Sequence, residues 1–129
     1  MAKILIVEDE PIAQSVMKIL LTSKLGHQVK VASSGMEALE KATKDVDFIL
    51  MDIGLPDWGN EGGVKATKKI RAKGGHFAKI PIIALTANED KELILKMIEA
   101  GADDYLNKPA NQKQLAEIIA EFTQHPHAA

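Results

Sequence analysis

The chain of 129 residues has 46% hydrophobic and 26% charged residues, proportions that are ordinary for one soluble globular domain. Its formal net charge of −2 gives no electrostatic reason to expect nucleic acid or an anionic membrane as a partner. The absence of cysteine excludes disulfides, thiolate catalysis and thiolate metal sites.

The N-terminus shows no pattern of a secretory signal peptide, because a short uncharged run after Lys3 already ends at Glu8. No apolar run approaches the roughly 20 residues that a membrane-spanning helix needs. We therefore expect a cytoplasmic protein with one domain over residues 1–124 and a frayed tail over residues 125–129.

The chain begins with an apolar run, residues 3–7, that is typical of a buried strand. Pro11 suits the first turn of a helix, which we predict to continue to about Lys24. The apolar residues of this helix share one face: they are Ile12, Val16, Ile19 and Leu20. Gly26 ends the helix, and residues 28–32 alternate between apolar and polar as an edge strand does.

A second helix and the most apolar strand of the chain come next. Ser34 and Glu37 form a capping-box pattern that opens the helix. The residues that we expect to face inward are Met36, Leu39 and Ala42. Four consecutive apolar residues then predict a strand over residues 47–52, covered by helices on both faces, before Gly54 and Pro56 break it.

The second half of the chain continues the same alternation of strands and helices. We predict helix 64–73, strand 80–85, helix 89–100, strand 103–106 and a last helix 111–122, for which Asn111 is the cap. The loop 57–63 contains the only tryptophan, Trp58, among several glycines, and we expect this side chain to be exposed. Five strand–helix units in succession predict an α/β fold with a parallel sheet and helices on both faces.

Polar side chains follow four of the predicted strands, at the point where each strand ends. They are Glu8, Asp9, Asp52, Thr86 and Lys108. The carboxyl ends of parallel strands meet at one edge of a sheet, where open α/β folds bind ligands, so we expect these side chains to converge. The simpler alternatives are that the acidic residues and the threonine cap helices or turns, and that the lysine is an ordinary surface residue.

The chemical types of these five side chains indicate phosphoryl transfer. Three neighbouring carboxylates repel one another unless a cation neutralises them, and Mg²⁺ is a hard cation that binds oxygen ligands. A lysine can hold a phosphate as a point charge, and a threonine hydroxyl can donate to a phosphate oxygen. With Asp52 as the nucleophile, the set predicts a Mg²⁺-dependent reaction that forms an aspartyl phosphate.

Five short segments resemble the receiver domain of two-component response regulators. They are residues 8–9, 51–56, 84–87, 101–105 and 108–109, in the order and spacing of that family over essentially the whole chain. The resemblance implies a flavodoxin-like fold with strand order 2-1-3-4-5. Residues 81–88 are similar to receivers attached to hybrid sensor histidine kinases, so we expect that origin.

The resemblance implies that Asp52 accepts a phosphoryl group from a phosphohistidine of a sensor histidine kinase or a phosphotransfer domain. Lys108 and Thr86 would hold the phosphoryl oxygens. In receivers the threonine then moves toward the phosphate and an aromatic residue of the fifth strand turns inward. Here that residue is Tyr105, for which a half-buried position without a switch role is the alternative. The surface of the last two helices would change its affinity for a partner.

The resemblance also implies how Mg²⁺ is held. Besides Asp52, its ligands would be Asp9 directly, Glu8 through water and the backbone carbonyl of Gly54. Asn88 could orient an attacking water and so influence the lifetime of the phosphate.

These expectations describe a signalling switch, either a monomer or a phosphorylation-dependent dimer, that contacts neither nucleic acid nor membrane. A phosphohydrolase of the haloacid dehalogenase type is one alternative, but such enzymes carry a second aspartate where this chain has Gly54. A module that acts through unphosphorylated contacts would not need the complete acidic, threonine and lysine set. A flavodoxin-type protein would need a phosphate-cradling loop, which the sequence lacks.

Overall fold

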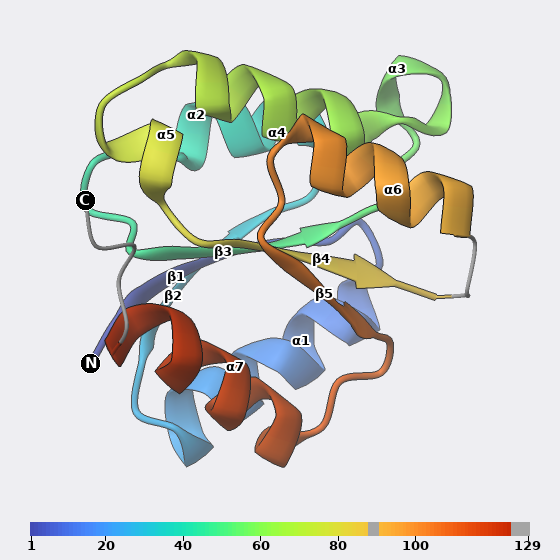
Figure 1. Ribbon diagram of the computed structural model, residues 1–129. Coiled ribbons are helices and arrows are strands. Elements are labelled where there is room, and N and C mark those ends of the chain that lie inside the picture. Colours follow the sequence, from blue (N-terminus) through green and yellow to red (C-terminus); the bar gives the residue numbers. More distant parts are fainter. Residues whose placement is uncertain (88–90, 125–129) are drawn as a thin grey trace.

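The computed structural model describes residues 1–87 and 91–124, and it contains one parallel sheet between two layers of helices (Figure 1). The strands are β1 (Lys3–Val7), β2 (Gln28–Ala32), β3 (Phe48–Asp52), β4 (Ile82–Thr86) and β5 (Asp104–Asn107). All pairings are parallel, and the order across the sheet is β2-β1-β3-β4-β5. The predicted α/β fold and its strand order are therefore confirmed.

The helices divide between the two faces of the sheet (Figure 1). One face carries α2 (Gly35–Lys41), the single turn α3 (Asp57–Asn60), α4 (Gly62–Ala72), α5 (His76–Lys79) and α6 (Lys91–Ala100). The other face carries α1 (Pro11–Ile19), its π-helical continuation η1 (Leu20–Lys24) and α7 (Gln112–Gln124). Within the part of the chain that the structure describes, none of these helices has the length and hydropathy to cross a membrane.

The unbroken apolar runs of the strands fill two separate cores. Ile4 and Ile6 pack with α1 and α7, whereas Leu5 and Val7 pack with α2, α4 and α6. Successive strand residues point to opposite faces, so the body of a strand between two helical layers is apolar in an unbroken run, and polar residues come at its end. Accordingly, all five residues of β3 and all five of β4 are buried.

Two expectations about inward-facing residues are wrong. Ile12, Val16 and Ile19 of α1 are 72%, 48% and 55% exposed, because the helix packs on the sheet through Met17 and Leu21 instead. The helix carries apolar residues on more than one row, and only packing decides which row is buried. Met36 of α2 is likewise 62% exposed, while its neighbours Leu39 and Ala42 contact the core as expected.

The boundaries of the predicted elements shift by one or two residues. Strand β4 begins at Ile82 and ends with Thr86, and β5 begins at Asp104. The predicted helix caps are confirmed: Ser34 Oγ accepts from the Glu37 N–H at 3.0 Å, and Asn111 Oδ1 accepts from the Gln114 N–H at 2.8 Å. Asn88 and the predicted frayed tail, residues 125–129, lie outside the described residues.

The loop after β3 differs most from expectation. Trp58 is half-buried rather than exposed, with Lys69 Nζ 5.5 Å from its ring centroid. Trp58, Gly59 and Asn60 all have positive φ angles, of 54°, 69° and 67°. Left-handed backbone costs roughly 1–2 kcal/mol for each residue with a Cβ atom. Contacts elsewhere must therefore hold this segment in place.

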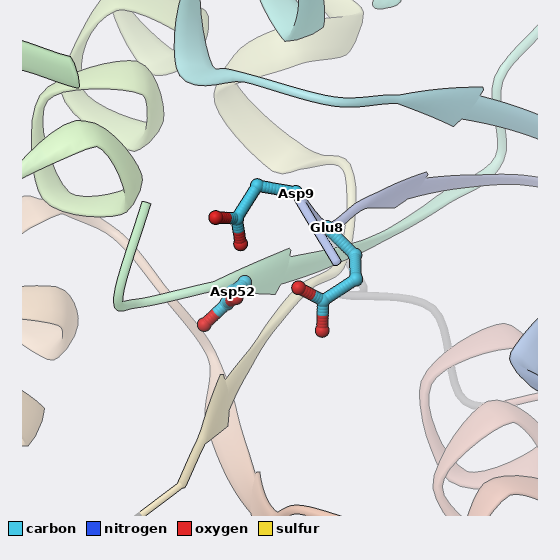
Figure 2. Close-up of side chains that lie close together, drawn as sticks. All are labelled: Glu8, Asp9 and Asp52. Carbon is cyan, nitrogen blue, oxygen red and sulfur yellow. The ribbon is translucent and has the colours of Figure 1, made fainter. Parts of the chain in front are cut away.

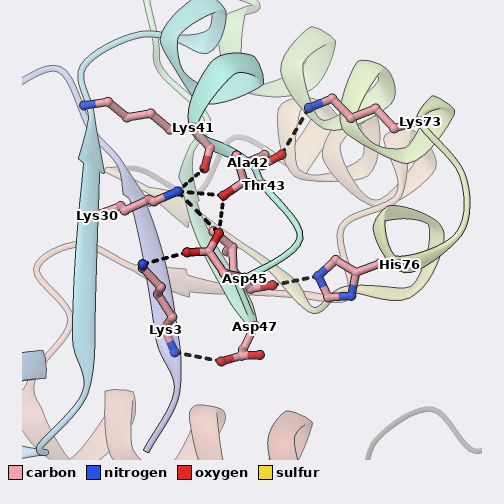
Figure 3. A network of polar contacts seen from close by, with 10 residues as sticks. Lys3, Lys30, Lys41, Ala42, Thr43, Asp45, Asp47, Lys73 and His76 are labelled. Atoms are coloured by element: carbon pink, nitrogen blue, oxygen red, sulfur yellow. Dashed lines mark hydrogen bonds and ion pairs between the residues drawn. The ribbon is translucent and has the colours of Figure 1, made fainter.

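A network of charged side chains lies near the amino ends of strands β1 and β3, at the edge of the sheet opposite to their carboxyl ends (Figure 3). Asp45, in the connection between α2 and β3, accepts from Lys3 Nζ at 2.6 Å and lies 3.5 Å from Lys30 Nζ. Lys73, which directly follows α4, donates to the Ala42 carbonyl at 3.2 Å in the same connection. This network ties the connection to β1, β2 and α4.

Candidate functional site

Three carboxylates gather at the carboxyl edge of the sheet (Figure 2). Glu8 and Asp9 directly follow β1, and Asp52 is the last residue of the adjacent strand β3. One carboxylate oxygen from each of the three lies within 4.8 Å of the others. Glu8 is completely buried and Asp52 is 5% exposed, whereas Asp9 is exposed. The sequence-predicted acidic cluster is thus a real juxtaposition in the fold.

Lys108 reaches this cluster from beyond the end of β5. Its Nζ atom lies 2.6 Å from Glu8 Oε1 and 3.2 Å from Asp52 Oδ2. Its backbone N–H donates to the Thr86 carbonyl at 2.8 Å, which continues the pairing of β5 with β4 past the end of the strand. The Lys108–Pro109 peptide bond is cis.

Opposing effects act on the pKa of Lys108. Burial by itself lowers the pKa, but the hydrogen bond to Glu8 and the charges of Asp52 and Glu8 outweigh it, so the pKa lies above its ordinary value. The ammonium group is therefore charged at neutral pH. It provides a fixed positive charge at the cluster.

The pKa of Asp9 is also raised. Partial desolvation is the largest cause of this rise, although the side chain is exposed, and the neighbouring Glu8 carboxylate raises the pKa further. A backbone hydrogen bond and the charge of Lys108 lower the pKa but do not cancel the rise. Loss of solvent and the proximity of Glu8 thus both disfavour the charged form of Asp9. A cation at this point would remove the repulsion.

The other predicted site residues, Thr86, Gly54 and Tyr105, differ in how deeply they are buried. Thr86 is buried at the end of β4, next to β3 in the sheet. The N–H of Gly54 donates to Asp52 Oδ1 at 2.9 Å and so orients the carboxylate. Tyr105 is 42% exposed on the edge strand β5, where it pairs with Ala84. Its side chain is directed to the surface rather than into the site.

Two residues that the sequence did not single out contact the site or its surroundings. Gln14 of α1 donates from Nε2 to the Glu8 carbonyl at 2.5 Å and to Ser33 Oγ at 3.1 Å. Asp57, five residues after Asp52, binds the amino end of α2. Neither belongs to a short motif, and each has a partner 19 or more residues away, so no local pattern could reveal them.

The residues present fit a divalent cation. Three carboxylates against one ammonium group leave two negative charges in excess at the cluster. The buried Glu8 Oε1 atom pairs with the Lys108 ammonium at 2.6 Å, and within residues 1–87 and 91–124 no other hydrogen-bond donor contacts it. All candidate ligands are oxygen atoms, the donors that Mg²⁺ prefers. We infer that the cluster can hold such an ion.

Comparison of the sequence with protein families gives a match to the response regulator receiver domain over residues 4–120. Among curated proteins, the chain is 41% identical over 124 residues to hybrid signal transduction histidine kinase I of Dictyostelium discoideum, covering 91% of this chain and 7% of that protein. It is 33% identical over 126 residues to the osmosensing histidine protein kinase SLN1 of Saccharomyces cerevisiae, covering 93% and 10%. The chain thus spans a small part of these relatives.

Solved structures share the whole fold. The receiver domain of the sensor histidine kinase PA1611 of Pseudomonas aeruginosa, solved with a magnesium ion in its active-site cleft, has a TM-score of 0.82 and 37% identity, over 93% of this chain and 95% of that one. The chemotaxis response regulator CheY4 of Vibrio cholerae has a TM-score of 0.81 and 30% identity, over 94% and 98%.

Proposed function

The chain belongs to the response regulator receiver domain family, and from this premise we propose that it is a phosphorylatable switch whose acceptor is Asp52. The observation that carries the proposal is the cluster itself: the buried Asp52 carboxylate has two acidic neighbours, and its Oδ2 atom lies 3.2 Å from the Lys108 ammonium. The phosphoryl donor is a phosphohistidine of a sensor histidine kinase or a phosphotransfer domain. The domain acts in the cytoplasm as part of a hybrid histidine kinase or of a similar phosphorelay, and its only reactions are its own phosphorylation and slow dephosphorylation.

In the proposed reaction an oxygen of the Asp52 carboxylate attacks the phosphorus atom of the donor. A new P–O bond forms, the P–N bond of the phosphohistidine breaks, and the imidazole leaves with the electron pair of that bond. Gly54, through its N–H to Asp52 Oδ1, leaves the other oxygen for attack. Lys108 is 3.2 Å from that second oxygen and stabilises the negative charge of the incoming group.

Glu8, Asp9, Asp52 and the Gly54 carbonyl would hold Mg²⁺, which would supply positive charge to offset the carboxylates and the phosphoryl oxygens. The Thr86 hydroxyl donates to a phosphoryl oxygen. We propose that this bond starts the switch, with Tyr105 turning inward from its exposed position.

The output surface in this proposal comprises α6, β5 and α7. Its support is the set of large apolar side chains that α6 and β5 expose, Leu95 at 60%, Ile98 at 41% and Tyr105 at 42%. Exposed apolar groups on neighbouring elements favour a protein partner. Inward rotation of Tyr105 would change this surface and therefore the affinity for the partner or for a second copy.

The donor surface in this proposal is the exposed apolar row of α1. Ile12 and Val16 line an open cavity of about 350 Å³ that also reaches Glu8, Lys108 and Pro109. A helix of the donor that covers this row would bring its phosphohistidine to the edge of the site. The unexpected exposure of the row supports this docking position, since burial against a partner would compensate for it.

The acceptor is tested by the mass of the intact protein after incubation with acetyl phosphate and Mg²⁺. We expect one added phosphoryl group in the wild type and none in Asp52→Asn or with excess EDTA. Beryllium fluoride, a phosphoryl mimic, should perturb Trp58 fluorescence in the wild type only. An unmodified wild type that also ignores beryllium fluoride would exclude the proposed function.

Docking on α1 is tested with the double variant Ile12→Ser and Val16→Ser. We expect phosphoryl transfer from a phosphorylated phosphotransfer domain to slow by roughly tenfold or more. A few residues that become buried at the centre of an interface carry most of its binding energy. Phosphorylation by acetyl phosphate should be unchanged, since this donor needs no docking surface. Leu95→Ser, an equally exposed apolar residue on α6, is the control. Equal rates of phosphoryl transfer to the wild type, the double variant and Leu95→Ser would mean that the donor docks on another surface.

A further inference from the structure

A carboxylate that takes no part in the proposed chemistry is tied to the segment after the acceptor. Asp57 begins α3, three residues after Gly54. Its side chain accepts from the first two N–H groups of α2: Oδ1 from Gly35 at 3.2 Å and Oδ2 from Met36 at 3.0 Å. One carboxylate therefore joins the loop after β3 to a helix more than 20 residues earlier in the chain.

Asp57 completes the capping of α2. The next N–H group, from Glu37, donates to Ser34 Oγ at 3.0 Å, and that of Ala38 donates to the Ser34 carbonyl at 3.0 Å. The first N–H groups of a helix have no partner within it, and a negative charge interacts favourably with them. The two bonds from Asp57 are thus charge-assisted, which makes them stronger than bonds between neutral groups.

The junction between the loop and α2 has room for this carboxylate only because two glycines lack side chains. A Cβ atom at Gly35 would lie 2.8 Å from both the Gly62 carbonyl oxygen and the Trp58 ring. A Cβ atom at Gly62 would overlap the Asp57 carboxylate itself. The close approach holds Asp57 and Trp58 between the amino ends of α2 and α4.

The residues that follow Asp57 need such support. Trp58 and Asn60 have positive φ angles, which non-glycine residues keep only where the surrounding structure holds them. The Trp58 ring packs against Gly35, the same residue that Asp57 binds. The capping bonds and this contact together fix the left-handed turn.

This left-handed turn also fixes the residues before it, 54–56, which lie next to the site. Only Leu55, which is completely buried, and Pro56 separate Gly54 from Asp57. The Gly62 N–H donates to the Leu55 carbonyl at 3.2 Å, which closes the segment on itself. A shift of Asp57 therefore has a short path to Gly54 and to its bond with Asp52 Oδ1.

We propose that Asp57 is a positioning residue for the cation site: by binding the Gly35 and Met36 N–H groups, it fixes residues 54–56 so that Gly54 orients the Asp52 carboxylate and presents its carbonyl to Mg²⁺. The proposal rests on the proposed function, because it requires the cluster to bind Mg²⁺. It adds a residue that touches neither the ion nor the phosphoryl group.

The test is a titration of the whole chain with MgCl₂, followed by NMR at the backbone amide of Gly54. We expect the dissociation constant to rise roughly tenfold in Asp57→Ala, the lower end of the roughly 10–100-fold loss of affinity seen when residues that orient metal ligands are replaced. Asp57→Asn keeps the shape and one acceptor oxygen, and it should give a smaller rise. This second variant serves if the alanine variant does not fold.

Ser34→Ala is the matched control. It also removes one capping bond from the first turn of α2, but Ser34 has no bond to the loop after β3. Both variants should lower the melting temperature, and only Asp57→Ala should weaken Mg²⁺ binding. Unchanged affinity in Asp57→Ala, or an equal loss in both variants, would mean that Asp57 only caps α2. A wild type that binds no Mg²⁺ would overturn the proposed function and this inference with it.

Discussion

Glu8 and Lys108 form the most constrained pair of side chains in the site. Glu8 is completely buried, and its Oε1 atom has the Lys108 ammonium at 2.6 Å. A buried charge whose partner is removed is strongly destabilising. Lys108 therefore contributes to the stability of the fold as well as to the proposed binding of the phosphoryl group. Its 3.2 Å contact with Asp52 connects the two roles.

Asp9→Asn tests the repulsion within the cluster. Because the pKa of Asp9 is raised in the folded protein, the unfolded chain ionises first as pH rises above 3.8, and folding becomes less favourable. We expect the variant to be more stable than the wild type near neutral pH in EDTA, with a melting temperature higher by roughly 1–3 °C. Mg²⁺ should stabilise the wild type and have little effect on the variant.

Thermal unfolding with and without Mg²⁺ measures both effects, and Glu40→Gln, an exposed acid on α2, is the control. A lower melting temperature for Asp9→Asn in EDTA would show that the Asp9 charge is stabilising, against our reading of the cluster.

At the level of elements, one side chain joins α4 to the segments that directly precede β4 and β5. Arg71 donates from Nη1 to the Ile80 carbonyl at 2.6 Å, and from Nη2 to the Gly101 carbonyl at 2.7 Å and Asp103 Oδ2 at 3.1 Å. Burial lowers the pKa of Arg71, and the charge and hydrogen bond of Asp103 oppose this effect. The planar guanidinium satisfies several acceptors at once, which a lysine cannot do.

We expect Arg71→Lys to lower the free energy of unfolding by about 2–3 kcal/mol, because several carbonyl groups lose their donor. Urea unfolding measures the change. Lys68→Gln, on the exposed face of the same helix, should stay within about 0.5 kcal/mol of the wild type. A similar small effect for Arg71→Lys would mean that water replaces the lost donors.

At the scale of the whole molecule, the two edges of the sheet carry clusters of charged side chains in which a carboxyl pKa shifts in opposite directions. The carboxyl edge carries the acidic cluster, where desolvation and the neighbouring Glu8 raise the pKa of Asp9. The opposite edge carries the Asp45 network, where the hydrogen bonds of Lys3 and Thr43 and the charges of Lys3 and Lys30 hold the pKa of Asp45 well below its usual range. The Asp9 carboxylate at one edge therefore opposes folding near neutral pH, and the Asp45 carboxylate at the other supports it.

Asp45→Asn should reveal this support through its pH dependence. A carboxyl whose pKa is lowered on folding stabilises the protein above its unfolded value of 3.8, and the contribution is lost as pH falls below that value. We expect the variant to be less stable than the wild type by the same amount at about pH 7 and about pH 5, and by less at about pH 3. High salt should also narrow the difference, since the ion pairs are exposed.

Urea unfolding of both proteins at each pH gives the comparison. A difference that stays constant across the series would mean that Asp45 contributes through hydrogen bonding in its neutral form.

The sequence by itself determined the alternation of strands and helices, the family, and the polar residues that follow the strand ends. These features depend on neighbours in the chain: apolar runs show buried strands, and caps such as Ser34 and Asn111 act on groups three residues away. The convergence of Glu8, Asp9 and Asp52 could also be predicted, because a parallel sheet brings strand ends to one edge.

Only the tertiary structure decided which apolar row of α1 is buried, that Trp58 is half-buried, and that Asp57 binds α2. In each case the deciding contact joins groups far apart in the chain. A helix with apolar residues on two rows can pack through either, and an aspartate in a turn has no preferred distant partner until the helices are in place. Local propensity gives no information about such contacts, because their energy exists only in the assembled fold.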